Sequence, residues 1–169
     1  MTISLHAASV PVFSQMLNSL SDILHKAEAH AAEKNIDPGV LLAARLYPDM
    51  FPLVRQVQIA ADFSRGVSAR LAGLEPPVFE DDHRSFADCQ ALIRKTLDFI
   101  AAIEPALIDG QEAREIVTRP GTPKEKRFNG QSYLLGYGIP QFFFHVSTAY
   151  AILRHNGVPL GKKDYMGTY

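Results

Sequence analysis

The chain has little cysteine, and this scarcity excludes two classes of cross-link. Cys89 is the one cysteine among 169 residues, so no disulfide can form within the chain. A zinc site with four cysteine ligands is excluded for the same reason. Cys89 falls on an apolar helical stripe, which is typical of a small buried hydrophobe rather than of a nucleophile.

The sequence also lacks the segments that direct a protein into or across a membrane. Its N-terminal stretch, MTISLHAASVPVFSQM, has no basic region followed by a long apolar core, so it does not resemble a signal peptide. No apolar run approaches the roughly 20 residues that a membrane span needs. With 17 basic and 18 acidic residues, the chain has no global attraction to nucleic acid or anionic lipid. We therefore expect a cytoplasmic protein with no membrane partner, and a nucleic-acid partner is not expected either.

Motifs of the common active sites are missing as well. The chain has no HxxxH or HExxH pair of metal ligands, no GxSxG nucleophile elbow, no phosphate-binding glycine loop and no dinucleotide fingerprint. Zinc needs about three protein ligands that converge on one point. One helical turn before and after His145 stand Gln141 and Ala149, which do not supply a second histidine. The residues alone therefore predict no metal site and no other cofactor.

The chain does contain the hydrophobic periodicity of long helices. Apolar residues recur at spacings of three to four over four segments. These segments cover approximately residues 10–32, 49–73, 85–105 and 131–156. Between the third and fourth segments lies a long connection without strong periodicity, in which Pro120-Gly121 predicts a small hairpin. The sequence therefore predicts a single all-α domain over 1–169, a four-helix bundle with a long connection between helices three and four.

The second and fourth segments carry further predictions. The apolar stripe of the second segment runs from Leu53 to Leu71 and includes one amide, Gln56. Its opposite face is expected to meet solvent and consists of Arg55, Gln58, Asp62 and Arg65. Pro140 predicts a kink or a broken first part in the fourth segment, because proline removes a helical hydrogen bond. The tail, residues 158–169, is predicted to be an extended strap.

A narrow polar seam interrupts the fourth helix. At about 100° per residue, Gln141, His145 and Thr148 fall on one side. Gln56 is the matching polar residue of the second helix, and a buried polar group without a partner costs about 1–3 kcal/mol. Two interpretations stay open. Either these four side chains belong to a hydrogen-bonded core, or they form the wall of a small polar pocket between helices two and four.

Apart from this seam, the fourth helix is apolar on nearly every side. Such a helix is buried on every side, whereas each helix of a lone four-helix bundle has one face in water. The fourth helix therefore has more apolar surface than one bundle can bury. This predicts a second partner that buries it, and the simplest partner is another copy of the chain. We therefore expect a homodimer.

Three stretches resemble a bacterial family of unknown function within the DinB/YfiT-like superfamily. They are FFFHVSTAYAILRHNGVPLGKKDYMG, YPDMFPLVRQVQIAADF and RLAGLEPPVFED, and the resemblance covers nearly the whole chain. It implies a four-helix bundle with a long crossing connection, and it implies dimers. Many members of the superfamily carry a metal site of three histidines, and some resemble thiol-dependent transferases or metal-dependent hydrolases.

The chain departs from this metal pattern at two of the three positions. Gln56 stands about where the histidine of the second helix is expected, and Ala149 breaks the HxxxH pair to which His145 would belong. The resemblance therefore implies the place of a pocket but no metal chemistry. The first hypothesis is a non-catalytic homodimer whose pocket binds a small molecule. The alternative is a metal-dependent hydrolase or thiol transferase that uses His145, so whether the chain is an enzyme is left open.

Overall fold

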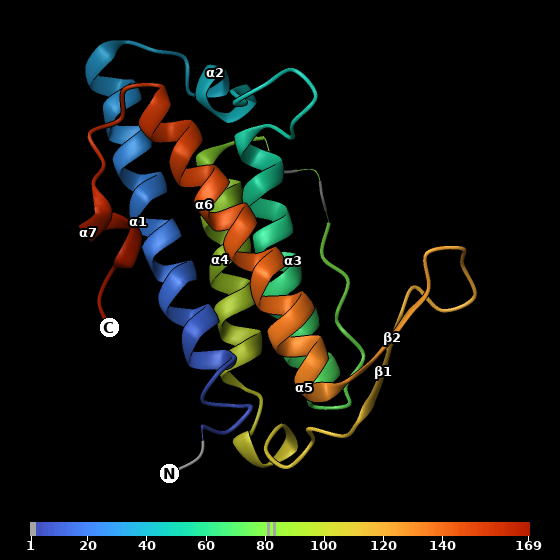
Figure 1. Cartoon of the computed structure of the whole chain (residues 1–169). Helices are drawn as coiled ribbons and strands as arrows, with labels where there is room; N and C mark the ends of the chain where they lie inside the picture. The colour runs from blue at the N-terminus through green and yellow to red at the C-terminus, as the bar shows by residue number, and fades with distance from the viewer. Residues whose placement is uncertain (1–2, 81, 83) are drawn as a thin grey trace.

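A bundle of long helices with a small hairpin at one end forms the structure (Figure 1), a computed structural model that describes residues 3–80, 82 and 84–169. The long helices are α1 (Val10–Lys34), α3 (Leu53–Leu71), α4 (Phe86–Ala101) and α6 (Ile139–His155). α3 packs against both α4 and α6, and α1 packs against α4. The predicted all-α four-helix bundle is confirmed. Among the described residues, no helix is long and apolar enough to cross a membrane.

The apolar stripes of the long helices meet in one core. Phe13 of α1 and Phe142 of α6 are both fully buried and pack edge to face, with ring centroids 4.8 Å apart. Burying one such side chain stabilises the fold by about 1.5–3 kcal/mol. Further fully buried side chains come from each long helix, among them Leu17, Leu20, Leu53, Leu71, Ile93, Ile100 and Ile152. The periodicity of the sequence therefore corresponds to the faces that the helices bury.

Side-chain caps fix where two helices begin. The carboxylate of Asp37 accepts a hydrogen bond from the backbone N–H of Gly39 at 2.8 Å and starts α2 (Pro38–Ala43). At α4, the Ser85 hydroxyl accepts from the N–H of Asp88 and the Asp88 carboxylate accepts from the N–H of Ser85. This reciprocal pair satisfies two backbone donors that the helix itself leaves without partners. α4 therefore has a defined first turn directly after the loop.

The long connection between α4 and α6 contains the predicted hairpin. A 3₁₀ turn, η1 (Pro105–Leu107), leads to strands β1 (Glu115–Thr118) and β2 (Lys126–Asn129). The strands are antiparallel, and their register pairs the first residue of β1 with the last residue of β2. Pro120-Gly121 lies in the turn between them. The hairpin projects beside the lower end of α3 in Figure 1.

The fourth helical segment has a broken first part, which is one of the two irregularities that Pro140 predicts. It consists of α5 (Gly130–Tyr133), a π-helical turn η2 (Leu134–Gly138) and then α6, with Pro140 in the first turn of α6. A proline in a helix removes one hydrogen bond, and its ring collides with the carbonyl four residues earlier, here that of Gly136. The wider π turn accommodates this collision. The predicted irregularity therefore lies upstream of the proline.

The face of α3 that was expected to meet solvent is partly covered, which corrects the prediction. Gln58 and Arg65 are only 4% and 7% exposed. The loop between α3 and α4 runs back along the bundle (Figure 1) and brings Phe79 over Arg65. The Phe79 ring lies 4.1 Å from the Arg65 guanidinium and 4.1 Å from the Lys95 ammonium, so it receives a cation from each of two helices. A loop that folds back is not visible in the periodicity of α3 itself.

The tail also differs from the predicted extended strap, because it contains a short helix, α7 (Lys162–Met166), packed on α1. The Ser19 hydroxyl lies 2.6 Å from the carbonyl oxygen of Asp164 and 2.7 Å from that of Tyr165. On α6, the Tyr165 hydroxyl lies 2.8 Å from that of Ser147, so the tail covers part of α6. The chain itself therefore supplies some of the burial for which a second copy was expected, and the homodimer stays a prediction.

The close approach of η2 to α3 generates a first prediction. A Cβ atom added at Gly138 would lie 2.7 Å from a methyl carbon of Val67, whereas a Cβ at Gly136 would meet nothing within 4 Å. Valine is stiff at χ1 and cannot move aside. We therefore expect Gly138→Ala to lower the free energy of unfolding by about 1–3 kcal/mol, measured by urea denaturation. Gly136→Ala, in the same turn, is the matched control, and equal stability of the two variants would contradict this packing.

Candidate functional site

A hydrogen bond between an amide and an imidazole joins α3 to α6. The Nδ1 atom of His145 lies 2.7 Å from the Oε1 atom of Gln56. The Nε2 atom of the same amide donates to the carbonyl oxygen of Phe51 at 3.1 Å, which sets the orientation of the amide. Since Oε1 can only accept, Nδ1 of His145 carries the proton and donates it. The lone pair of the imidazole is therefore on Nε2.

The surroundings keep this imidazole neutral. His145 is 7% exposed, and burial lowers its pKa from 6.5 to about 4, with a further contribution from the positive charge of Arg55. Its Nε2 atom has no hydrogen-bond partner among the described residues. The site therefore presents one neutral hydrogen-bond acceptor at neutral pH.

Aromatic rings enclose the imidazole. The Phe63 ring is stacked on that of His145 at a centroid distance of 6.0 Å and an angle of 15°. Phe144 meets the imidazole edge-on at 5.2 Å. Phe63 also packs against Tyr137 of η2 at 5.8 Å. The polar pair is therefore the end of a longer aromatic layer that follows α3 towards the hairpin.

Only two of the four predicted pocket residues are brought together. Gln56 and His145 form the bond described above, as the hydrogen-bonded interpretation expects. The Thr148 hydroxyl donates to the carbonyl oxygen of Phe144, within its own helix, at 2.7 Å. Gln141 is half-buried and lines a separate shallow hollow of about 240 Å³ together with Gly136, Tyr137, Pro140 and Phe144. A pocket made of all four residues stays a prediction.

Cys89 is not a candidate nucleophile. Its side chain is fully buried in the core. Burial, followed by the negative charge of Asp88, raises the pKa of the Cys89 thiol to about 12. The thiolate is the nucleophilic form, so at neutral pH this sulfur is an unreactive thiol, as the apolar stripe predicts.

A cavity lies beyond Phe63, where α3, the hairpin and η2 meet. It has a volume of about 190 Å³. Its wall combines aromatic rings with charged and polar groups, from Asp62, Phe63, Val67, Arg70, Thr118, Arg119, Tyr133 and Tyr137. Next to it is a groove of about 330 Å³, and both are lined by Arg70 and Arg119. Binding sites typically combine apolar walls with a few convergent polar groups, and this cavity has that composition.

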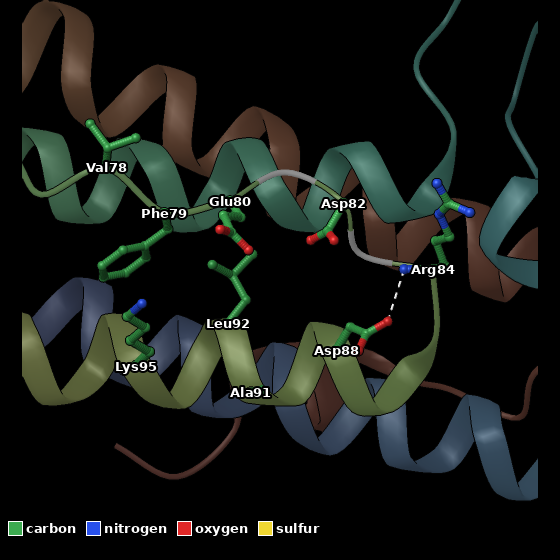
Figure 2. A pocket seen from close by; sticks show the side chains of 9 residues that line it. All are labelled: Val78, Phe79, Glu80, Asp82, Arg84, Asp88, Ala91, Leu92 and Lys95. Carbon is green, nitrogen blue, oxygen red and sulfur yellow. Dashed lines mark hydrogen bonds between the residues drawn. The ribbon is translucent and has the colours of Figure 1, made fainter.

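A larger hollow, of about 740 Å³, lies between α4 and the loop that precedes it (Figure 2). Its lining is open and mixed in charge, with Glu80 and Asp82 on the loop opposite Asp88 and Lys95 on α4. The carboxylate of Asp88 accepts from the backbone N–H of Arg84 at the mouth of the hollow. Asp81 and His83 of the same loop lie outside the described residues. The charges of this loop also predict a solvated face at Asp81-Asp82, and of this pair only Asp82 lies among the described residues.

Comparisons with known proteins agree with this fold. The family described as "Domain of unknown function (DUF1993)" matches residues 5–166. The chain belongs to the DUF1993 family. A crystal structure described as a DinB family member from Shewanella denitrificans is 38% identical, with a TM-score of 0.91, over 98% of this chain and 93% of that chain. No curated protein matches the chain. The predicted place among DinB-like bundles of unknown function is therefore confirmed.

The donor set of this DUF1993 protein does not fit the metal site of three histidines that the superfamily resemblance implies. The Oε1 atom of Gln56 already accepts the hydrogen bond from Nδ1 of His145, so the pair offers a metal one free nitrogen, Nε2 of His145. In the described part of the chain, no group of three or more His, Cys, Asp or Glu side chains converges. Glu80 and His83 have the ExxH spacing of some helical metal ligands, but Glu80 lies in a loop without helix and His83 is outside the described residues.

The cavity-lining tyrosines and arginines were not predicted from the sequence. Tyr133 and Tyr137 are four residues apart, a spacing that places two rings on one helical face, so the sequence carried a weak signal for them. Arg70 and Arg119 line the same cavity only because the hairpin folds against the end of α3. Their proximity depends on tertiary structure and has no local signal.

The low pKa of His145 generates a second prediction, about stability at low pH. Between pH 6.5 and pH 4 the imidazole is protonated in the unfolded chain but not in the folded one, so stability falls as the pH falls through this window. His145→Gln removes this dependence. We expect the difference in unfolding free energy between wild type and variant to shrink by about 1–3 kcal/mol from pH 7 to pH 4.5, measured with urea. His155→Gln, at the exposed end of α6, is the control, and the same change in both variants would contradict the assignment.

Proposed function

We propose that the protein is a non-catalytic, DinB-like binding protein that takes a small molecule between α3 and the start of the fourth helical segment. The observation that carries this proposal is the 190 Å³ cavity walled by Phe63, Tyr133 and Tyr137. A cavity of about 150 Å³ is enough to bind benzene, so this one suits a single planar ring with its substituents. Phe63 also stacks on His145, so one aromatic ring connects the cavity wall to the predicted polar pair.

The chemistry of His145 favours binding over catalysis. A general base works best when its pKa lies near the working pH, and the pKa of His145 is lowered to about 4 by burial. Such an imidazole is a weak base at neutral pH but a good hydrogen-bond acceptor. Its Nδ1 proton is already committed to Gln56. The geometry therefore supports a fixed hydrogen-bond acceptor that the Phe63 ring separates from the cavity.

The enzyme alternative has less support. A metal-dependent hydrolase or thiol transferase using His145 needs further ligands, and the described residues supply one free nitrogen at the seam. Cys89, the one cysteine, is buried with its pKa raised to about 12, so it provides no reactive thiol. A cytoplasmic location stays a prediction from composition.

We further propose that the protein is a homodimer that uses the exposed stripe of α6. Pro140 and Phe144 are one helical turn apart and exposed, and Phe144 is 56% exposed. Large exposed rings beside a shallow hollow are typical of a contact surface, and the 240 Å³ hollow around Gln141 adjoins this stripe. α7 covers the neighbouring Tyr150, so the stripe is the part of α6 that a second copy can bury.

Ligand binding generates a third prediction. Tyr137→Ala removes one wall of the cavity, and an aromatic contact contributes about 0.5–1.5 kcal/mol. We expect benzamide, benzoate and phenyl phosphate each to bind this variant about 3- to 10-fold more weakly than wild type, measured by chemical-shift titration. Tyr150→Ala removes a ring that packs on Tyr165 instead and is the matched control. No binding of any probe to the wild type, or an equal loss in both variants, would contradict the proposal.

The dimer generates a fourth prediction. A carboxylate at the centre of an apolar contact is costly to bury, so Phe144→Asp should convert a particle of twice the 18.7 kDa chain mass into one of the chain mass, by light scattering after size exclusion. Val78→Asp, at a side chain that is 94% exposed in the loop before α4, introduces the same charge elsewhere and should leave the mass unchanged. A monomeric wild type would contradict the dimer.

A further inference from the structure

The cavity and the groove beside it bring three arginines together. Arg70 and Arg119 line both, and Arg114 lines the groove. Arg70 comes from the last turn of α3, whereas Arg114 and Arg119 come from either end of β1. Segments distant in the sequence therefore place positive charge around one 190 Å³ cavity and one 330 Å³ groove.

The guanidinium groups are oriented by neutral oxygens. Arg70 donates to the carbonyl oxygen of Gly66 at 3.1 Å and to the hydroxyl oxygen of Tyr133 at 3.2 Å. Arg114 donates twice to the amide oxygen of Gln111, at 3.1 and 2.9 Å. Among the described residues, the Arg119 side chain has no hydrogen bond. None of these contacts neutralises the charge of the arginine concerned.

Two of the carboxylates in the lining are engaged elsewhere. Asp62 pairs with Arg65 at 2.6 Å. Glu115 pairs across the hairpin with Arg127 at 3.1 Å. Glu75 is the remaining acidic residue of the lining and is exposed to solvent. The lining therefore holds three arginines and three carboxylates, and two of these carboxylates are paired with arginines outside it. The three lining arginines have no ion pair among the described residues, and positive charge on a concave wall raises the local concentration of anions.

The backbone is adapted to this arrangement at two positions. Arg119 has a φ of 52°, a left-handed conformation that is uncommon for a residue with a side chain. Such conformations are unfavourable for most residues and cluster at binding and active sites. At Gly73, whose φ is 73°, a Cβ atom would lie 1.7 Å from a guanidinium nitrogen of Arg114. The missing side chain therefore makes room for Arg114 in the groove.

We propose that this site binds a small organic anion, with its planar part against Phe63 and Tyr137 and its charged group held by Arg70 and Arg119. This inference rests on the proposed ligand-binding function and names the class of ligand. Guanidinium groups bind carboxylate and phosphate with two parallel hydrogen bonds. Carboxylate and phosphate are therefore the two headgroups to compare.

The test uses the full chain and probes that differ only in charge. Benzoate and phenyl phosphate should each bind at least tenfold more tightly than neutral benzamide, measured by chemical-shift titration at constant ionic strength. The better of the two anions identifies the headgroup. Benzamide binding as tightly as both anions would overturn the anion inference while leaving the small-molecule proposal intact. No binding of any probe would overturn both.

Arg119→Asn locates the anion site. Asparagine tolerates the left-handed backbone, so the hairpin is retained and only the charge is lost. We expect anion binding to weaken about tenfold and benzamide binding to stay unchanged. Arg154→Gln is the control, because it removes the same charge from the last turn of α6, at the opposite end of the bundle from the hairpin (Figure 1). This variant should bind all three probes as tightly as the wild type does. A loss of anion binding no larger than that in Arg154→Gln, or an equal loss for benzamide, would overturn the proposal.

Discussion

Gln56 and His145 join α3 to α6 through a hydrogen bond inside an otherwise apolar seam, and the register of the two helices follows from it. The two helices run in opposite directions (Figure 1), so this one pair determines which residues meet along the seam. Further along it, Phe63 meets Tyr137 and Arg70 meets Tyr133. A slip by one helical turn would leave a buried amide and imidazole without partners, at a cost of about 1–3 kcal/mol for each.

The same bond decides what the imidazole can do. Because Gln56 fixes the proton on Nδ1, and burial lowers the pKa of His145 to about 4, the ring is neutral and only Nε2 can accept. A second histidine in place of Gln56 would offer a nitrogen lone pair to a metal, whereas the amide oxygen is already used within the pair. The described residues of this seam therefore support the packing and register of the two helices rather than the coordination of a metal.

How much the sequence alone could predict depended on whether the signal was local. Helix periodicity and the turn at Pro120-Gly121 are local, and both appear in the structure as predicted. The pairing of Gln56 with His145 was also anticipated, since two polar residues in facing apolar stripes need partners. The burial of Arg65 under Phe79 was missed, because it depends on a loop that folds back over α3. The placement of Arg70 and Arg119 in the wall of one cavity depends in the same way on the hairpin, so the cavity had no local signature.

Pro140 connects the local sequence to the cavity. Its ring cannot follow a regular helical turn at Gly136, and the chain adopts the wider π turn η2 directly before α6. This turn carries Tyr137, and its last residue, Gly138, lets η2 approach Val67 on α3. A continuous α-helix would place Tyr137 at a different angle around the axis, since each residue of a π turn rotates less than in an α-helix. The irregular turn therefore sets the ring that closes one side of the proposed binding site, which explains why the cavity lies at the broken end of the fourth helical segment rather than beside His145.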